Sequence, residues 1–268
     1  MAHDILLVTK GHPFEREPFF AMFDALDGVA WTHVEQPAAQ ALFAVEPAAP
    51  FDAFVLYDMP GIVFHADGPP DFPAPDPTYQ RRFFELLEHG HGFVFLHHAI
   101  AGWPAWPEYA DIVGGRFLYL PGSLRGRMRQ DSGYRHDVTH EVRVLNRHPV
   151  TDGVPERFSL TDELYLYEVF EDDVQPLLAS GHEFTAENFF SAAHVVRDGR
   201  MFSNEGWSHE PGSNLIGWVR HHAASRIVYL QCGDGPQAYA SPEFRRLLGN
   251  AIAWVSEVNG PRRRPRGV

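Results

Sequence analysis

The sequence predicts a doubly wound, three-layer α/β domain built on a mostly parallel sheet. Continuous apolar runs without polar alternation are typical of parallel strands that helices cover on both faces. Such runs occur at residues 4–9, 53–57 and 92–96. Each run precedes a segment whose apolar residues have helical spacing, at residues 18–26, 79–89 and 106–113 respectively. Alternating strands and helices with this order favour the doubly wound arrangement.

The middle third of the chain has a different pattern. Residues 134–144 alternate polar with apolar side chains, and residues 158–170 and 174–178 are also strand-like. This pattern predicts a β-rich antiparallel or mixed extension, inserted in the α/β layout. The chain then returns to a strand at 226–231 and a long helix at 241–258, which begins with the capping sequence Ser-Pro-Glu.

We expect one domain over residues 1–260, followed by a basic, Pro-rich tail at 261–268 that is disordered and solvated. The Pro-rich stretch 68–77 has the composition of a linker. Because the strands on both sides belong to the same predicted sheet, we interpret it as a lid-like loop.

Composition excludes several classes of protein. The hydrophobic fraction of 44% and the charged fraction of 21% are those of a globular protein. No apolar run reaches the roughly 20 residues that cross a bilayer, and the start lacks a signal sequence, so we expect a cytoplasmic protein without a membrane role. The net charge of −13 disfavours nucleic acid as a partner. Cys232 is the single cysteine, which excludes an intrachain disulfide, and we expect it to be a dispensable core residue.

Polar residues follow three of the predicted strands. His12 follows the first, Asp58 the second, and the pair His97-His98 the third. Because the carboxyl ends of parallel strands share one rim, we expect these side chains to line one cleft. The alternative is that the histidines are loop residues hydrogen-bonded to the backbone.

Several short motifs together resemble the trehalose-utilisation (ThuA-like) family. In chain order they are Gly92-Phe-Val-Phe-Leu-His97, Trp106-Pro-Glu-Tyr109, Ile112 to Phe117, His148 to Gly153, Asp162-Glu-Leu-Tyr165 and Gly233 to Leu248. The resemblance implies a flavodoxin-like fold related to class I glutamine amidotransferases, without their nucleophilic cysteine, whose position His97 takes. It also implies a role in sugar utilisation, on oxidised (3-keto) glycosides made by a partner sugar dehydrogenase. Asp234 stands where the family commonly has a histidine.

Two further segments carry candidate residues. Adjacent strand residues point to opposite faces, so Glu163 and Tyr165 share a face that Asp162 does not; an edge-strand salt bridge is the competing interpretation. The loop 204–210 contains Glu205, Trp207 and His209, a combination that sugar pockets use. Its alternative is a surface loop anchored by one Trp. The pair at 221–222 is expected to be exposed and structural.

The leading hypothesis is a hydrolase or lyase of carbohydrate metabolism that is not a cysteine-dependent amidotransferase. His97 or His98 would act as general acid or base, assisted by Glu163 or Asp234, with Trp103 and Tyr165 forming an apolar wall. The rivals are a non-catalytic module that binds a sugar or a partner protein, and a structural subunit of an assembly such as a homo-oligomer. No cofactor motif is present. A divalent metal such as zinc, held by His12, His97 and His98, is a further alternative.

Overall fold

The computed structural model describes residues 2–48, 50–65 and 68–257. Within them, one sheet of ten strands has the order β12-β8-β11-β13-β14-β4-β3-β1-β2, and β9 pairs with β8. Five of these strands run parallel: β1 (His3–Lys10), β2 (Val29–Glu35), β3 (Ala53–Asp58), β4 (Gly92–Leu96) and β14 (Ser225–Leu230). Counted along the chain, their spatial order is 2-1-3-4-5, the flavodoxin-like order, which confirms the predicted fold class.

The other half of the sheet is antiparallel. Its strands are β8 (Gly133–Val144), β9 (Arg157–Leu166), β11 (Gln175–Ser180), β12 (Phe190–Ser191) and β13 (Leu215–His222). All of them come from the chain between β4 and β14, where the sequence predicts a β-rich extension; β8, β9 and β11 correspond to its three predicted segments. They continue the parallel sheet directly, because β13 pairs with β14.

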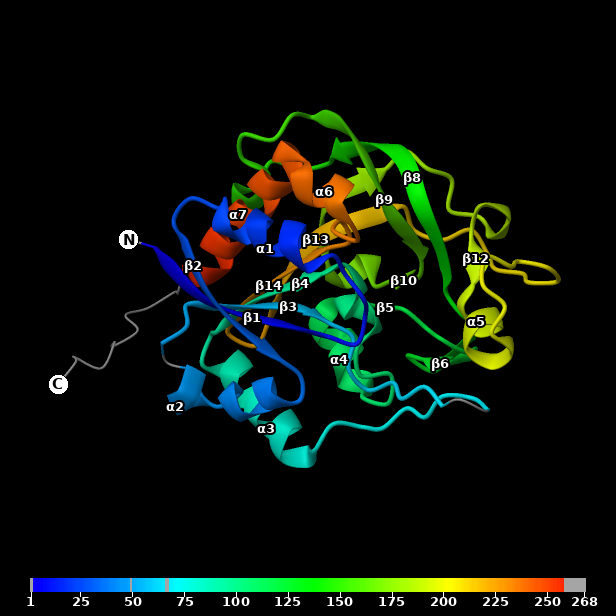
Figure 1. Cartoon of the computed structure of the whole chain (residues 1–268), viewed down its shortest axis with the longest axis horizontal. Helices are drawn as coiled ribbons and strands as arrows, with labels where there is room; N and C mark the ends of the chain where they lie inside the picture. The colour runs from blue at the N-terminus through cyan, green and yellow to red at the C-terminus, as the bar shows by residue number, and fades with distance from the viewer. Residues whose placement is uncertain (1, 49, 66–67, 258–268) are drawn as a thin grey trace.

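Helices cover both faces of the parallel half (Figure 1). One layer contains α1 (Arg16–Asp24), α6 (Pro236–Ala240) and α7 (Pro242–Ser256), and the other α2 (Val45–Ala48), α3 (Pro77–Glu88) and α4 (Pro107–Val113). Successive strand residues serve opposite layers: Leu7 packs with α1 and α7, whereas Leu6 packs with α3 and α4. A Cβ at Gly92 would collide with the Val255 carbonyl of α7, so a glycine there lets this helix lie close to β4.

The helix and strand boundaries follow local chemistry. Ser241 caps α7 by accepting a hydrogen bond from the Phe244 amide, as the Ser-Pro-Glu sequence predicts. Two of the longer strands, β2 and β13, are absent from the sequence predictions, as are the short strands β5 (Gly115–Arg116), β6 (Gly122–Leu124), β7 (Arg127–Arg129) and β12. Of the two longer strands, β2 is an edge strand whose sequence, VAWTHVE, lacks a continuous apolar run. The other, β13, ends in two polar histidines that interrupt its apolar stretch.

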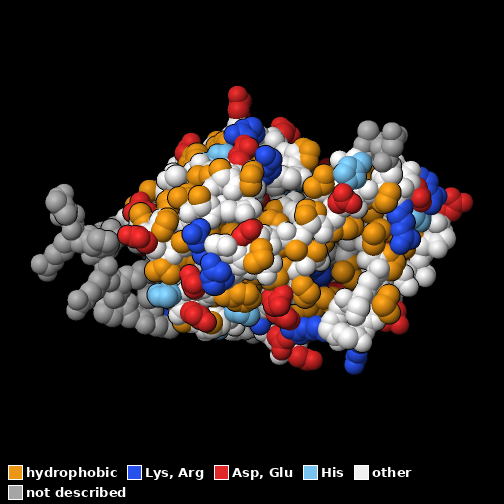
Figure 2. Space-filling model, turned by 90° about the horizontal axis from the view of Figure 1, so that it is seen from below, with side chains coloured by type: hydrophobic (Ala, Val, Ile, Leu, Met, Phe, Trp, Pro, Cys, Tyr) orange, Lys and Arg blue, Asp and Glu red, His pale blue; other side chains and the backbone are white. Residues whose placement is uncertain are grey.

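The described part of the chain also contains shorter elements. Among them are α5 (Ala192–Asp198), the pair of β5 with β10 (Glu168–Val169), and the pair of β6 with β7. No helix among the described residues combines the length and the apolar character that a membrane span requires. On the face shown in Figure 2, acidic and basic side chains are interspersed with apolar ones. The tail 261–268 and the last residue of the helix expected at 241–258 lie outside the described residues.

Candidate active site

His97 is a buried histidine in an unusual backbone conformation. It directly follows β4 and opens the short 3₁₀ helix η2 (His97–Ala101), with a φ of 47° and no exposed surface. A positive φ is uncommon outside glycine, and such strained positions concentrate at functional sites. Its Nδ1 lies 2.6 Å from the Gln231 carbonyl oxygen at the end of β14. Because a carbonyl can only accept, Nδ1 carries a proton.

The other ring nitrogen of His97 faces two acids and a phenol. Its Nε2 lies 3.0 Å from Glu163 Oε2, 3.4 Å from Asp234 Oδ1 and 2.7 Å from the Tyr165 hydroxyl. Burial by itself would lower the pKa of His97, but the hydrogen bonds and charges of Asp234 and Glu163 outweigh it and raise this pKa well above its usual value. His97 is therefore a buried imidazolium. With both nitrogens engaged, this geometry does not favour the general-base role that the sequence suggested for it.

The two acids beside His97 are positioned by backbone contacts. Glu163 and Tyr165 lie on the same face of β9, as expected from strand alternation, and both reach His97. Asp162 points the other way and accepts hydrogen bonds from the Gly233 and Asp234 amides at 2.7 and 2.9 Å. Burial raises the pKa of Asp162 to about 6. Asp162 thus fixes the loop after β14 that carries Asp234.

Asp234 is the charged counterpart of His97. Burial would raise its pKa, but the hydrogen bond and charge of His97 outweigh burial and lower this pKa to about 2. His136 lies near Glu163, with Nε2 3.4 Å from Oε1. Two carboxylates and the His97 imidazolium consequently form one charged cluster at the carboxyl ends of β4 and β14.

Two more imidazoles, those of His12 and His98, border this cluster. His12 stacks on His98 with ring centroids 4.6 Å apart. Burial, followed by the charge of His97, lowers the pKa of His12, and burial lowers that of His98 well below the usual value. The His98 Nε2 faces the Tyr57 carbonyl at 3.3 Å. Both rings are therefore neutral at neutral pH.

Sequence reasoning missed His136. It lies on β8, where the pairing with β9 shifts register between Arg135 and Val138 and Asp137 has a φ of 55°. Bulges of this kind re-aim side chains and are frequent next to active sites. The signal in the sequence is weak: Arg135, His136 and Asp137 are three consecutive polar residues, and a second polar triplet follows at 139–141 in the same strand.

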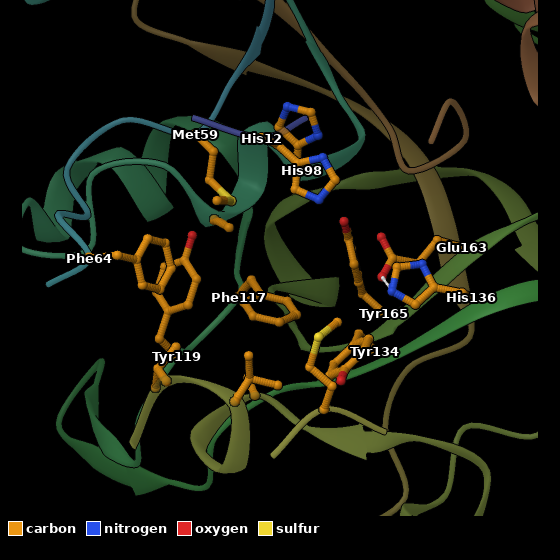
Figure 3. A pocket seen from close by; sticks show the side chains of 15 residues that line it. His12, Met59, Phe64, His98, Phe117, Tyr119, Tyr134, His136, Glu163 and Tyr165 are labelled. Atoms are coloured by element: carbon orange, nitrogen blue, oxygen red, sulfur yellow. Dashed lines mark ion pairs between the residues drawn. The ribbon is translucent and has the colours of Figure 1, made fainter. Parts of the chain in front are cut away.

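A cavity of about 170 Å³ opens beside the cluster (Figure 3). Glu163 and the imidazoles of His12, His98 and His136 form its polar end. The rest of its wall is apolar and largely aromatic, and comprises Met59, Phe64, Ala101, Phe117, Tyr119, Tyr134, Tyr165, Ala192, Val195, Val196 and Met201. Glu163 is the one carboxylate among the described residues that line the cavity. None of the four aromatic residues Phe64, Phe117, Tyr119 and Tyr134 was singled out from sequence.

Asp58 does not line this cavity, contrary to the sequence-based expectation. Its side chain is buried, and Gln36 donates a hydrogen bond to one of its oxygens at 2.8 Å. Burial raises the pKa of Asp58 to about 7. A strand-end position therefore brought Asp58 to the rim, but not to the cavity.

Trp103 also lies away from the cavity, so it does not form the expected wall with Tyr165. It has a φ of 47° and packs on Tyr79 with ring centroids 5.7 Å apart. The expected lid at 68–77 contributes no described residue to the lining, although its Phe72 stacks on Tyr119 at 5.7 Å. Met59 and Phe64, from the same β3–α3 connection, do line the cavity.

The loop 204–210 lies outside the cavity wall. Glu205 pairs with Arg200 in a largely exposed contact, and His209 contacts the adjacent Glu210 carbonyl. Trp207 donates its indole N–H to Asp131 at 3.1 Å. The same carboxyl accepts hydrogen bonds at the start of α5, a helix that lines the cavity. Trp207 thus supports the cavity wall from behind. This arrangement agrees with the alternative interpretation of 204–210 as a surface loop anchored by one Trp.

Among the residues that the structure describes, one group of side chains could hold a metal ion. His12, Glu163 and Asp234 each offer a ligand atom, and these atoms lie within 4.8 Å of one another. The metal site expected from sequence consists of His12, His97 and His98. His97 cannot serve as a ligand there, because both of its ring nitrogens already have hydrogen-bond partners.

Comparison with known proteins gives the family. A family model described as trehalose utilisation, ThuA, matches residues 5–255. Among solved structures, a ThuA-like protein from Parabacteroides merdae superposes with a TM-score of 0.63 at 16% identity, covering 97% of this chain and 93% of its own. A ThuA-like protein from Bacteroides uniformis gives 0.60 at 17% identity, with 94% and 91% covered.

A cytoplasmic protein from Salmonella typhimurium gives a TM-score of 0.57 at 10% identity, covering 95% of this chain and 100% of its own. At such identities, the structural likenesses establish the fold alone. No curated protein matches the sequence significantly. The family model, however, spans nearly the whole chain, and it agrees with the fold and with the motifs quoted above. The chain belongs to the trehalose-utilisation (ThuA) family, which implies a role in sugar utilisation.

Proposed function

We propose that this protein is an enzyme that cleaves oxidised (3-keto) glycosides by proton transfer at Glu163. One observation carries the proposal. The Glu163 carboxylate lies at the wall of the cavity, held from behind by the buried His97 imidazolium, while the imidazoles of His12, His98 and His136 surround the same end. Titratable groups with strongly shifted pKa values that converge on one cavity are typical of active sites.

The chemistry uses the acidity that a ketone gives to its neighbouring carbon. Glu163 removes the proton from C2, and the electron pair passes to the keto oxygen at C3 as an enolate. When the enolate collapses, the C1–O bond breaks and its electron pair leaves on the aglycone oxygen. His136, whose side chain is 34% exposed and lies 3.4 Å from Glu163, supplies the proton that this oxygen takes up. Addition of water across the C1–C2 double bond then yields the free 3-keto sugar.

His97 has a positioning role in this scheme. Its positive charge lowers the pKa of Asp234, and its Nε2, 3.0 Å from Glu163 Oε2, holds the Glu163 carboxyl group at the wall of the cavity. The substrate is the product of oxidation at C3, so a sugar dehydrogenase must supply it.

The test is turnover of matched 3-keto and unoxidised glycosides by the wild type and by Glu163→Gln. We expect kcat/KM on the 3-keto substrates to fall by about 10²-fold or more, the scale of general acid–base catalysis, with an unchanged circular dichroism spectrum. His221→Asn, on the exposed end of β13, is the matched control and should keep wild-type turnover. Wild-type turnover by Glu163→Gln contradicts the proposal. Binding of glycosides without any turnover favours the binding-module alternative.

A second candidate is metal-assisted cleavage, which the convergence of His12, Glu163 and Asp234 favours. Imidazole and carboxylate ligands suit zinc, which would polarise the keto oxygen. This version predicts that the purified protein contains stoichiometric zinc by elemental analysis and that His12→Ala loses it. Full activity after treatment with a chelator, in metal-free protein, excludes this version and leaves proton transfer by the side chains alone.

A further inference from the structure

Most of the cavity wall cannot satisfy the hydroxyl groups of a sugar. Beyond its polar end, the wall is formed by aromatic rings, methionines and the aliphatic face of α5. In Figure 3, Phe64 and Tyr119 lie on the side opposite Glu163 and His136, with Phe117 between them. A second pyranose ring placed there would bury hydroxyl groups without partners, which is costly. A disaccharide with two hydroxylated rings is therefore poorly matched to this wall.

The apolar part of the cavity borders solvent, so the cavity's volume of about 170 Å³ does not limit a ligand to one ring. Phe64 and Met201 line it and remain 59% and 55% exposed. Large apolar side chains left exposed at the border of a pocket gain burial when an apolar ligand covers them.

The apolar part contains one polar group without a partner. The Tyr119 hydroxyl is buried and makes no hydrogen bond to any described residue. Burial raises the pKa of this phenol, so it stays neutral. A buried hydroxyl without a partner costs free energy unless a ligand or a water satisfies it.

We infer that the substrates are aryl glycosides: the aromatic aglycone lies among Phe64, Phe117 and Met201, and the sugar ring faces Glu163. The inference rests on the proposed cleavage of glycosides and adds the chemical class of the leaving group. It also assigns a specificity role to Tyr119, whose hydroxyl pairs with a polar substituent on the aryl ring. A phenolate is a good leaving group for the elimination, which agrees with an aromatic aglycone.

The test is binding of unoxidised glucosides, which needs no turnover. Calorimetric titration compares phenyl glucoside with methyl glucoside, in both anomeric forms, and with trehalose. We expect the phenyl glucoside of one anomeric form to bind at least about tenfold more tightly than the matching methyl glucoside and than trehalose, from the burial of one ring. Equal affinities, tighter binding of trehalose, or no binding of any phenyl glucoside overturns the inference.

Variants of the wall locate the aglycone. Met201→Ala and Phe64→Ala should each weaken phenyl glucoside binding by about threefold or more, whereas Met128→Ala, a 74% exposed methionine on β7 outside the cavity, should not. Tyr119→Phe should weaken binding of a hydroxyphenyl glucoside but not of the phenyl glucoside. Unchanged affinity in both Met201→Ala and Phe64→Ala overturns the inference.

Turnover separates this inference from the proposed function. Cleavage of 3-keto trehalose as efficient as that of a 3-keto aryl glucoside would refute the aryl preference and leave the cleavage intact. Tight binding of aryl glucosides without any turnover of their 3-keto forms would refute the cleavage alone.

Discussion

Two acids at the same rim of the sheet behave in opposite ways. Asp58 ends β3 and Asp234 follows β14, and both are largely removed from water. Asp58 has an amide, Gln36, as its partner, and burial raises its pKa to about 7. Asp234 faces the His97 imidazolium, and its pKa is lowered to about 2. The parallel strands brought both acids to the rim, but the charge of the partner decides which of them is ionised at neutral pH.

The comparison also explains where the cavity lies. The antiparallel half of the sheet supplies Glu163 and His136 opposite the ends of β4 and β14, but it does not reach the end of β3. Asp58 therefore remains inside the protein, with one oxygen that has no partner among the described residues. A strand-end acid becomes part of a site only where a second layer of polar groups faces it.

The largest effect on stability should come from removing the His97 imidazolium, the charged partner that Asp234 has and Asp58 lacks. His97→Asn leaves Glu163 and Asp234 without their buried cation, so we expect the free energy of unfolding to fall by about 3–5 kcal/mol. Urea denaturation at pH 7 measures it, and His221→Asn, at an exposed position, should stay within about 0.5 kcal/mol of the wild type. Adding Glu163→Gln to His97→Asn should recover part of the loss. A loss below about 1 kcal/mol for His97→Asn would mean that His97 is not the stabilising cation.

The next effect is on how the free energy of unfolding depends on pH, which should have opposite signs for Asp58 and Asp234. The folded pKa of Asp58, about 7, is above its unfolded value of about 3.9. Between these values the folded state binds more protons than the unfolded state, so stability falls as the pH rises through this window. Asp58→Asn removes this dependence, so between pH 5 and pH 8 the stability of the variant relative to the wild type should rise by about 2–3 kcal/mol in urea denaturation.

Asp234→Asn is the matched comparison. Because the folded pKa of Asp234, about 2, is below its unfolded value, its stabilising contribution is present above about pH 4 and disappears as the pH falls towards 2. The substitution should therefore destabilise the protein at pH 7 and have little effect near pH 2. If the stability of the Asp58 and Asp234 variants changed with pH in the same direction, the opposite pKa shifts of the two acids would be contradicted.

The smallest effect concerns Cys232, which is adjacent to the site but has no role in the charged cluster. Burial raises the pKa of its thiol well above the usual value, so the thiol stays neutral. Its side chain packs in the core with α6 and α7. Cys232→Ala should lower the free energy of unfolding by about 1 kcal/mol and leave kcat/KM unchanged. A variant that folds normally but has lost its activity would place the thiol in the chemistry.

Much of the fold was determined by local patterns in the sequence. The apolar runs at β1, β3 and β4, the helices that follow them and the alternating strand β8 are all visible within short windows, because burial on two faces or on one leaves its own periodicity. β2 and β13 were not visible, since an edge position and terminal polar residues weaken the apolar signal. The expectation of one domain over 1–260 stays a prediction.

The sequence also selected the residues that meet at His97, namely Glu163, Tyr165 and Asp234, but not what each of them does. His97 and Glu163 are 66 positions apart, and only the packing of β9 against the segments that follow β4 and β14 gives the histidine its charge and leaves it no free nitrogen. The same packing, with the bulge in β8, brings in His136 and closes the aromatic wall. Charge state and cavity shape depend on contacts between distant segments, and for that reason the tertiary structure alone decided them.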